Sequence, residues 1–123
     1  MDKSDATPAI SDYHKACPFC LIAQHQAPGA TLYEYEDEDV VAFPDLHPIA
    51  DVHILIIPKR HYPDLNGLTA KDEPLFGKVV RVASELAAKH TITRGWQLFT
   101  RVGKGGGQEI GHVHFHLISG KRA

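Results

Sequence analysis

The stretch that decides both the fold and the chemistry lies near the C-terminal end of the chain and reads His112-Val113-His114-Phe115-His116-Leu117. Because successive side chains of an extended strand point to opposite faces, this alternation predicts a strand over residues 112–119 whose three imidazoles share one face, roughly 7 Å apart. Four glycines lie within residues 103–107, just before this strand, and their backbone N–H groups can approach an anion. A glycine-rich loop followed by a histidine-faced strand suggests phosphate chemistry.

Each of these features also has a purely structural explanation. Histidines can line the wet face of a half-buried strand, and four glycines can form a flexible hairpin turn. The loop matches neither a P-loop nor the dinucleotide-binding G-x-G-x-x-G. Three alternating imidazoles directly after it nevertheless favour the functional interpretation. A neutral imidazole can attack phosphorus to form a covalent intermediate, while a protonated neighbour donates to the leaving group.

The composition is that of an ordinary soluble protein. The 123 residues are 43% hydrophobic and 23% charged, with a net charge of −2, which predicts one domain and gives no indication of a nucleic-acid polymer as partner. Polar residues 1–12 predict a flexible tail, with a single domain over residues 13–123. No apolar run approaches the ~18 residues of a membrane span, and no signal peptide is present. We therefore expect a cytoplasmic protein with no membrane partner.

The apolar pattern predicts five strands and two helices. We expect a hairpin of strands at residues 30–36 and 40–43, a central strand buried on both faces at 52–57, and further strands at 96–102 and 112–119. A short helix is expected at residues 21–25, after a tight turn at the two cysteines. Since few neighbouring strands are separated by a helix, the order predicts an α+β fold with a five-stranded antiparallel sheet.

One long helix is predicted over residues 72–89. Asp72 is its expected N-cap, and Pro74 falls in the first turn, where a missing N–H does no harm. The apolar residues recur at helical spacing and predict one buried face, formed by Leu75, Phe76, Val79, Val80, Ala83, Leu86 and Ala87.

Several motifs together resemble one known family. The segment at residues 106–116 resembles the signature of the histidine triad (HIT) superfamily, H-φ-H-φ-H-φ with φ apolar. Residues 17–20, 43–48 and 53–61 look like the N-terminal half of that family, so that the similarity spans residues 16–119. The Gly-Gly-Gln-Glu variant is most like the Hint branch of nucleoside phosphoramidate hydrolases. The resemblance implies a HIT-like fold and a homodimer, with the long helix and the strand at Trp96 near the interface.

The resemblance also implies catalytic roles. His114 would be the nucleophile that takes the nucleoside monophosphate, and His116 would contact the phosphate or the leaving group. His112 would orient His114 or bind a metal. His53, on the predicted central strand, would complete the polar network around the triad.

Substrate-binding roles follow in the same way. Asp45 would hold the ribose hydroxyls and Leu46 would lie against a purine base. The phosphate-side lip of the pocket would be formed by Gly107, Gln108 and Glu109. Arg101 stands where Hint proteins usually carry an asparagine. It could contact a phosphate directly, or it could point away.

Cys17 and Cys20 are the only cysteines of the chain. They could be two small buried thiols, but a thioredoxin-like redox pair would need a βαβ context that is absent. A C-x₂-C turn can also present two thiolates to zinc. The resemblance implies that His61 and His112 complete a structural Zn²⁺ site, with His47 as the alternative ligand. The remaining histidines, which we expect to be surface residues, are His14, His25 and His90.

The resemblance, together with these residues, implies a nucleotide hydrolase without an organic cofactor. It would cleave nucleoside 5′-phosphoramidates or related nucleoside monophosphate esters through a nucleotidyl-histidine intermediate. A dinucleoside polyphosphate hydrolase or a nucleotidyl transferase is the alternative within the enzyme class. Outside that class, the alternatives are a non-catalytic nucleotide-binding regulatory module and a zinc-stabilised interaction protein.

Overall fold

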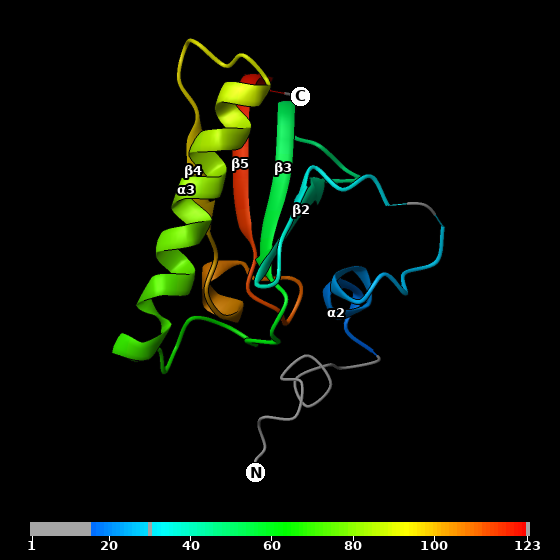
Figure 1. The fold of residues 1–123 in the computed structure, drawn as a ribbon, viewed down its shortest axis with the longest axis vertical. Helices are drawn as coiled ribbons and strands as arrows, with labels where there is room; N and C mark the ends of the chain where they lie inside the picture. The colour runs from blue at the N-terminus through cyan, green and yellow to red at the C-terminus, as the bar shows by residue number, and fades with distance from the viewer. Residues whose placement is uncertain (1–15, 30, 123) are drawn as a thin grey trace.

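The computed structural model describes residues 16–29 and 31–122 (Figure 1). The predicted tail at residues 1–12, and His14, lie outside the described residues. The elements are, in chain order, α2 (Pro18–Ala23), β1 (Tyr35–Glu36), β2 (Val40–Pro44), β3 (Ala50–Pro58), the 3₁₀ turn η1 (Ala70–Asp72), α3 (Glu73–Lys89), β4 (Gln97–Thr100), the 3₁₀ turn η2 (Lys104–Gly106) and β5 (Phe115–Arg122).

The strands form one antiparallel sheet in the order β1-β2-β3-β5-β4. The predicted α+β class is therefore confirmed, and so is the central place of β3. Leu55 of β3 is paired with His116 of β5, which in turn is paired with Phe99 of β4. Because directly paired residues of neighbouring strands point to the same face, these three side chains share one face of the sheet.

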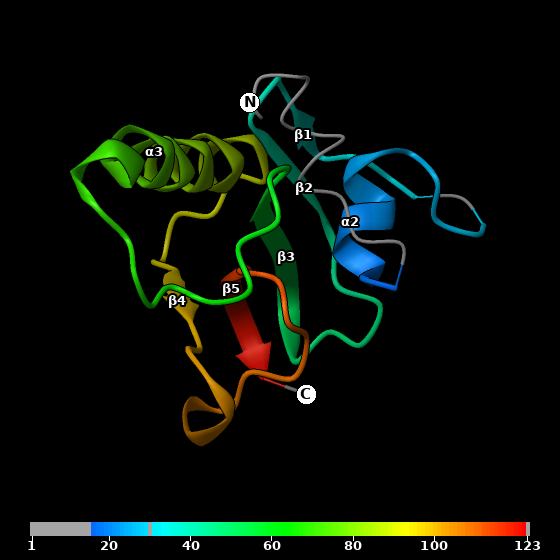
Figure 2. The same cartoon turned by 90° about the horizontal axis from the view of Figure 1, so that it is seen from below.

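The two helices cover opposite faces of the sheet (Figures 1 and 2). On one face, α3 packs Val79, Val82 and Leu86 against the sheet residues Ile54, Ile56 and Leu117. On the other face, Phe19 and Ala23 of α2 pack against a cluster formed by Val41, Phe43, Leu55 and Ile57. Since β3 is covered on both sides, its residues 53–58 are all buried, which explains why this strand reads as a continuous apolar run.

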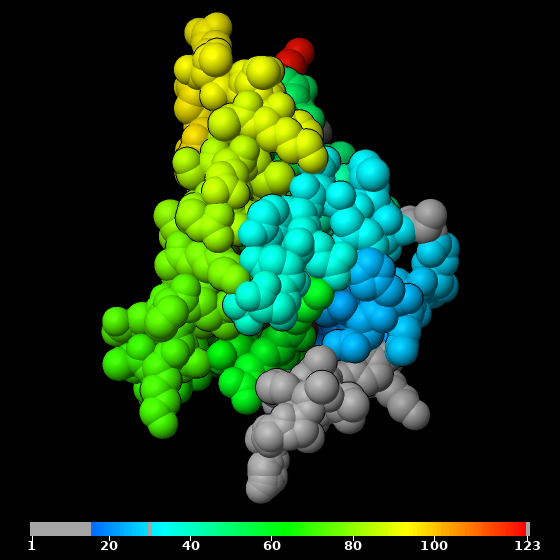
Figure 3. Space-filling view, in the orientation of Figure 1, coloured from blue at the N-terminus to red at the C-terminus, as the bar shows by residue number. Residues whose placement is uncertain are grey.

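The space-filling view shows how unevenly the helices cover the molecule (Figure 3). The long α3 extends along one side, while the short α2 lies beside the segment that leads into β2. The helix α2 thus covers only the β2–β3 part of its face of the sheet. The β5–β4 part of that face is where the site described below is found. In the described part of the chain, none of the helices has the length and apolar character needed to cross a membrane.

Several predicted strand boundaries differ from the structure, three of them by more than a residue at positions that matter for the site or the sheet edge. The first strand is confined to Tyr35–Glu36, and the fourth ends at Thr100. The last strand begins at Phe115 instead of residue 112. The N–H of Val113 donates to the carbonyl of Tyr62, at 2.7 Å, so the chain before β5 bonds to the segment that follows β3. His112 and His114 therefore precede the strand.

The N-terminal helix begins earlier than predicted, because its cap is a cysteine. Cys17 is the N-cap, and its Sγ accepts from the N–H of Cys20 at 3.2 Å. Pro18 follows at the first helical position, where its fixed φ suits the helix. The predicted tight turn is thus the first turn of α2, and the helix ends at Ala23 instead of residue 25.

The long helix agrees with the prediction in length but not at every position of its buried face. Val80 is 53% exposed, whereas Val82, which was not assigned to that face, is fully buried. Asp72 is the N-cap, as predicted, but its carboxylate makes no bond to the helix backbone. It accepts instead from the N–H of Thr69 and from the hydroxyl of Tyr62.

A matched pair of leucine substitutions tests the packing of α3. Leu86 is 3% exposed in the core, whereas Leu32 is 68% exposed. We expect Leu86→Ala to lower the free energy of unfolding by about 2 to 5 kcal/mol, because it leaves a cavity between α3 and the sheet. Leu32→Ala should change it by less than about 0.5 kcal/mol. Urea denaturation measures both, and equal losses for the two variants would contradict this packing.

Candidate active site

Three polar side chains form a row on the face of the sheet that α2 only partly covers. Asp45 follows the end of β2, His53 lies on β3 and His116 lies on β5. The Oδ2 atom of Asp45 is 3.3 Å from His53 Nε2, and that nitrogen is 2.9 Å from His116 Nδ1. Both histidines are more than nine-tenths buried. The row thus crosses three neighbouring elements, and its groups are largely shielded from water.

The hydrogen bonds of His53 determine where the protons of this row lie. Its Nδ1 accepts from the backbone N–H of Ile49, at 3.1 Å, so the proton of the neutral ring is on Nε2. That Nε2–H can donate to His116 Nδ1, which must then be an acceptor. The neutral form of His116 therefore carries its proton on Nε2. In the described part of the chain, His116 Nε2 is the only buried side-chain nitrogen or oxygen without a hydrogen-bond partner.

His114 has the opposite tautomer. Its Nδ1 lies 2.8 Å from the carbonyl oxygen of His112, and since a carbonyl can only accept, Nδ1 carries the proton. The lone pair is then on Nε2, and no described residue bonds to that atom. The ring is held by an edge contact with Phe19, with centroids 5.0 Å apart. The His114 carbonyl accepts from the Thr100 hydroxyl at 2.7 Å. His114 thus presents a fixed, unprotonated nitrogen.

The burial of the row keeps its histidines neutral. Desolvation, together with smaller contributions from the nearby His114, His53 and Arg101, lowers the pKa of His116 to about 4. Desolvation also lowers the pKa of His53, against the opposing effect of Asp45. Near neutral pH, His116 is therefore a neutral hydrogen-bond donor at Nε2. The rings of His114 and His116 lie 5.1 Å apart, which puts an N–H donor on one imidazole beside the bare nitrogen of the other.

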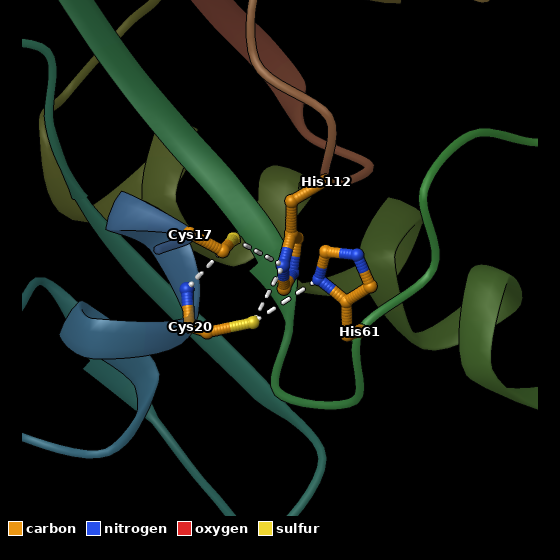
Figure 4. A group of neighbouring side chains, drawn as sticks. All are labelled: Cys17, Cys20, His61 and His112. Atoms are coloured by element: carbon orange, nitrogen blue, oxygen red, sulfur yellow. Dashed lines mark hydrogen bonds between the residues drawn. The ribbon is translucent and has the colours of Figure 1, made fainter. Parts of the chain in front are cut away.

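The ring of His112 belongs to a different cluster, so the predicted common face for the three imidazoles is wrong. Cys17, Cys20, His61 and His112 have ligand atoms that all lie within 4.8 Å of one another (Figure 4). Cys20 Sγ is 3.1 Å from His61 Nδ1 and 3.5 Å from His112 Nδ1. Cys17 Sγ is 3.4 Å from His112 Nδ1. All four sequence-predicted metal ligands thus come together.

These four groups fit a tetrahedral zinc ion. With Zn–S near 2.3 Å and Zn–N near 2.0 Å, sulfur and nitrogen ligands stand roughly 3.5 Å apart, which matches the distances above. The Nε2–H of His112 donates to the Pro58 carbonyl at 2.8 Å, leaving the Nδ1 lone pair directed at the cysteines, the arrangement usual for a metal-bound histidine. The alternative ligand, His47, is exposed and is not part of this cluster.

The glycine loop is braced by Gln108. The side-chain oxygen of Gln108 accepts from the Gly103 N–H, and its Nε2 donates to the carbonyls of Pro63 and Ile110. The N–H groups of Gly106, Gly107 and Gln108 also donate to carbonyls inside the loop. Glu109 is exposed. The Gln108 amide thus shapes the loop, and these three N–H groups already have acceptors within it.

Asp45 and Leu46 lie at the other end of the site. The Oδ1 atom of Asp45 accepts from the N–H of His47 at 2.8 Å, which fixes the carboxylate at the start of the loop between β2 and β3. Leu46 is 89% exposed, and Ile49 on the same loop is 37% exposed. Exposed apolar side chains can pack against a flat ring, and a fixed carboxylate next to them can accept hydrogen bonds from a polar group attached to that ring.

Several contributors to the site are absent from the sequence prediction. Phe99 stacks on His116, with centroids 4.7 Å apart and planes 10° apart. Phe19 touches the rings of both His112 and His114. The backbone groups of Ile49 and Pro58 fix two imidazoles. Phe99 could have been predicted only from the register of β4 against β5, which pairs it with His116. The backbone contacts leave no trace in the sequence, because any residue type can supply a backbone N–H or carbonyl.

Two histidines expected on the surface have structural partners. His25 is exposed, as predicted, and its Nε2 contacts the Glu36 carboxylate. His90 is half-buried, and its Nε2 lies 2.9 Å from Glu34 Oε1. Neither histidine is near the clusters described above, so neither adds to the site.

Comparisons with known proteins agree with this geometry. The family described as "Scavenger mRNA decapping enzyme C-term binding" matches residues 16–123. Protein HitA of Neisseria gonorrhoeae is 39% identical, over 83% of this chain and 94% of its own length. The purine nucleoside phosphoramidase of Escherichia coli K12 is 36% identical, over 84% of this chain and 86% of its own length.

Solved structures show the same relationship. A HIT family hydrolase from Legionella pneumophila is 37% identical, with a TM-score of 0.79, and covers 86% of this chain and 94% of its own. A histidine triad protein from Clostridium difficile is 34% identical, with a TM-score of 0.80, and covers 89% of this chain and 95% of its own. The chain therefore belongs to the histidine triad family of hydrolases.

Proposed function

We propose that the protein cleaves nucleoside 5′-phosphoramidates, or related nucleoside monophosphate esters, through a nucleotidyl intermediate on His114. The observation that carries this proposal is the pair of opposite tautomers. His114 presents a bare Nε2 because its Nδ1–H is bonded to the His112 carbonyl. Next to it, His116 presents a buried and unpartnered Nε2 that carries the proton. A lone pair beside a hydrogen-bond donor is an arrangement that can attack a phosphorus and stabilise its leaving group.

The reaction then proceeds in two displacements. His114 Nε2 gives its lone pair to phosphorus, the P–N bond of the substrate breaks, and the departing amine keeps that electron pair and takes a proton from solvent, while the neutral His116 donates a hydrogen bond to it through Nε2–H. Water next attacks the phosphorus, the bond from phosphorus to His114 Nε2 breaks, and the lone pair returns to the ring. The proton released by water returns to solvent, so the proton taken up in the first displacement is balanced and His116 keeps its Nε2–H throughout. The products are a nucleoside monophosphate and a free amine.

The other side chains of the row have complementary roles in this proposal. His53 orients His116 by donating to its Nδ1, so that the proton stays on the atom facing the substrate. Asp45 binds the ribose hydroxyls, and exposed Leu46 lies against the base. A purine is the base we favour, since the similar protein of E. coli is a purine nucleoside phosphoramidase.

A nucleotide-binding module without catalysis is the main alternative from another class. Binding alone does not require a fixed lone pair facing a hydrogen-bond donor, and this observation favours the enzyme. Hydrolysis of dinucleoside polyphosphates, or nucleotidyl transfer, would use the same first displacement with a different leaving group or acceptor. A panel of substrates separates these reactions.

The first test is His114→Ala, assayed with adenosine and guanosine phosphoramidates. We expect kcat/KM to fall at least about a thousandfold, because the nucleophile is lost. The exposed imidazole of His25 offers a matched control, and His25→Ala should retain wild-type rates. Circular dichroism would verify that both variants are folded. Undiminished turnover by His114→Ala would refute the mechanism, whereas tight nucleotide binding without turnover by the wild type would favour the module.

We further propose that Cys17, Cys20, His61 and His112 hold a structural Zn²⁺ ion. The S···N distances of 3.1 to 3.5 Å support this, as does the Nε2–H bond of His112. Four protein ligands would close the coordination sphere, so the ion would fix α2 against the segment before β5 and take no part in hydrolysis. The bond from His112 to the Pro58 carbonyl holds His112 in place, so that its own carbonyl can accept from His114.

Metal analysis tests this site. We expect about one zinc ion per chain in the purified protein, and much less in Cys20→Ser, since a serine hydroxyl is a poor zinc ligand. Loss of zinc should also lower the melting temperature, because binding free energy at such a site adds to folding free energy. Wild-type protein that contains no stoichiometric zinc, and whose melting temperature is unchanged by added zinc, would contradict the proposal.

The neutrality of His116 predicts how stability depends on pH. Between about pH 6.5 and 4 the unfolded chain protonates this ring while the folded chain resists, so the unfolded state binds more protons. The free energy of unfolding therefore falls as pH falls through this window. We expect wild type to lose about 1 to 3 kcal/mol more than His116→Gln between pH 7.5 and 5. Urea denaturation at both pH values gives the difference, and equal losses would show that His116 is not held neutral.

A homodimer is part of the proposal as well. The strand β4 lies at the edge of the sheet, and Trp96 beside it is 37% exposed. Val80 on α3 is an exposed apolar side chain too. An edge strand and exposed apolar groups are the features that a second copy would cover.

A further inference from the structure

We infer that Arg101 makes this protein selective for substrates whose leaving group carries a negative charge, either a carboxylate or a phosphate. The inference rests on the proposed function and specifies its substrate class. Three observations support it: the contacts that tie Arg101 to the catalytic row, its uncompensated charge, and the order of the side chains across the sheet.

The first observation is a short chain of ring contacts. The guanidinium carbon of Arg101 lies 5.0 Å from the centroid of the Phe99 ring. Phe99 is stacked on His116, the proposed hydrogen-bond donor to the leaving group, with planes only 10° apart. The two residues are also direct partners in the pairing of β4 with β5. Arg101 is therefore separated from the donor by a single aromatic ring.

The glycine loop leaves room for this arginine. A Cβ atom added to Gly107 would come within 3.1 Å of Arg101 Cδ, which is closer than side chains normally approach. The stem of Arg101 thus lies across the loop at a position that has no side chain. The guanidinium at the end of this stem lies over the ring of Phe99.

The second observation is the charge of Arg101. The side chain is exposed, and among residues 16–29 and 31–122 no carboxylate forms an ion pair with it. Its charge nevertheless reaches the site, because it lowers the pKa of both His53 and His116. A cation that acts on the catalytic row without an anionic partner is available to bind an anion.

The third observation is the order of the groups across the sheet. Asp45 follows β2, His53 is on β3, His116 is on β5 and Phe99 is on β4, which is the spatial order of those strands. If the ribose binds Asp45 and the phosphate lies between His114 and His116, the leaving group continues toward β4. Arg101 stands at that end of the row. Its flat fork of N–H donors matches a carboxylate or a phosphate with two parallel hydrogen bonds.

The test compares two leaving groups that differ in charge alone. The substrates are the adenosine 5′-phosphoramidate of glycine, which has a carboxylate, and that of glycinamide, which is neutral there. We expect wild type to prefer the glycine compound by about tenfold in kcat/KM, a size reasonable for a partly exposed hydrogen bond between two charged groups. Arg101→Met should reduce this ratio to near one, and Arg101→Lys should retain part of it. Lys104→Met, which removes an exposed cation from the same loop, should keep the wild-type ratio.

A third substrate shows whether Arg101 recognises a phosphate in the leaving group as well as a carboxylate. Diadenosine triphosphate has a phosphate in its leaving group, so Arg101→Met should lower its rate relative to the glycinamide compound if phosphates are also recognised. An effect on the glycine compound alone would restrict the selectivity to carboxylates. Equal rates for glycine and glycinamide in wild type, or equal losses for both in Arg101→Met, would overturn the inference while leaving the proposed hydrolysis intact. Failure of wild type to hydrolyse any of the three would overturn the proposed function and this inference with it.

Discussion

The hydrogen bond from His114 Nδ1–H to the carbonyl of His112 is the interaction on which the site depends. It fixes the tautomer of His114 and leaves a lone pair on Nε2. The carbonyl is itself held in place, because the His112 ring is bonded through Nε2 to the end of β3 and faces the two cysteines of α2 through Nδ1. One residue thus connects the proposed nucleophile to the central strand and to the N-terminal helix. This arrangement explains how a histidine outside regular secondary structure can be rigid enough for catalysis.

Burial determines the charge of the other histidines of the site. His53 on the central strand and His116 on β5 are both more than nine-tenths buried, with Phe99 of β4 stacked on His116, so they lie in a region that water hardly reaches. Their imidazoles are therefore neutral near pH 7, and a neutral chain of hydrogen bonds runs from Ile49 through His53 to His116. The chain ends at an unpartnered N–H. An unsatisfied buried donor is costly to the free enzyme, and a substrate phosphate or leaving group would satisfy it.

The sequence predicted well those features that depend on local pattern. The class of the sheet and the central place of β3 follow from the apolar run at residues 52–57 and from the strand order. The membership of the two histidine clusters followed from the family resemblance. The orientation of His112 could not be predicted, because it depends on the backbone bond between Val113 and Tyr62 and on cysteines about 90 residues away. The role of Phe99 could not be predicted for a related reason, since only the register of β4 against β5 places it on His116. Alternation within one strand was therefore a good guide to the existence of the site, and a poor one to where each ring points.

The proposed hydrolysis requires that His114 Nε2 form a covalent bond to the phosphorus of the substrate. Rapid mixing with an adenosine phosphoramidate, an alkaline quench that preserves the P–N bond, and peptide mass spectrometry test it most directly. We expect a nucleotidyl adduct on the peptide that contains His114, with fragmentation placing it on that residue. Turnover without any adduct, or an adduct on His112 or His116 instead, would contradict it.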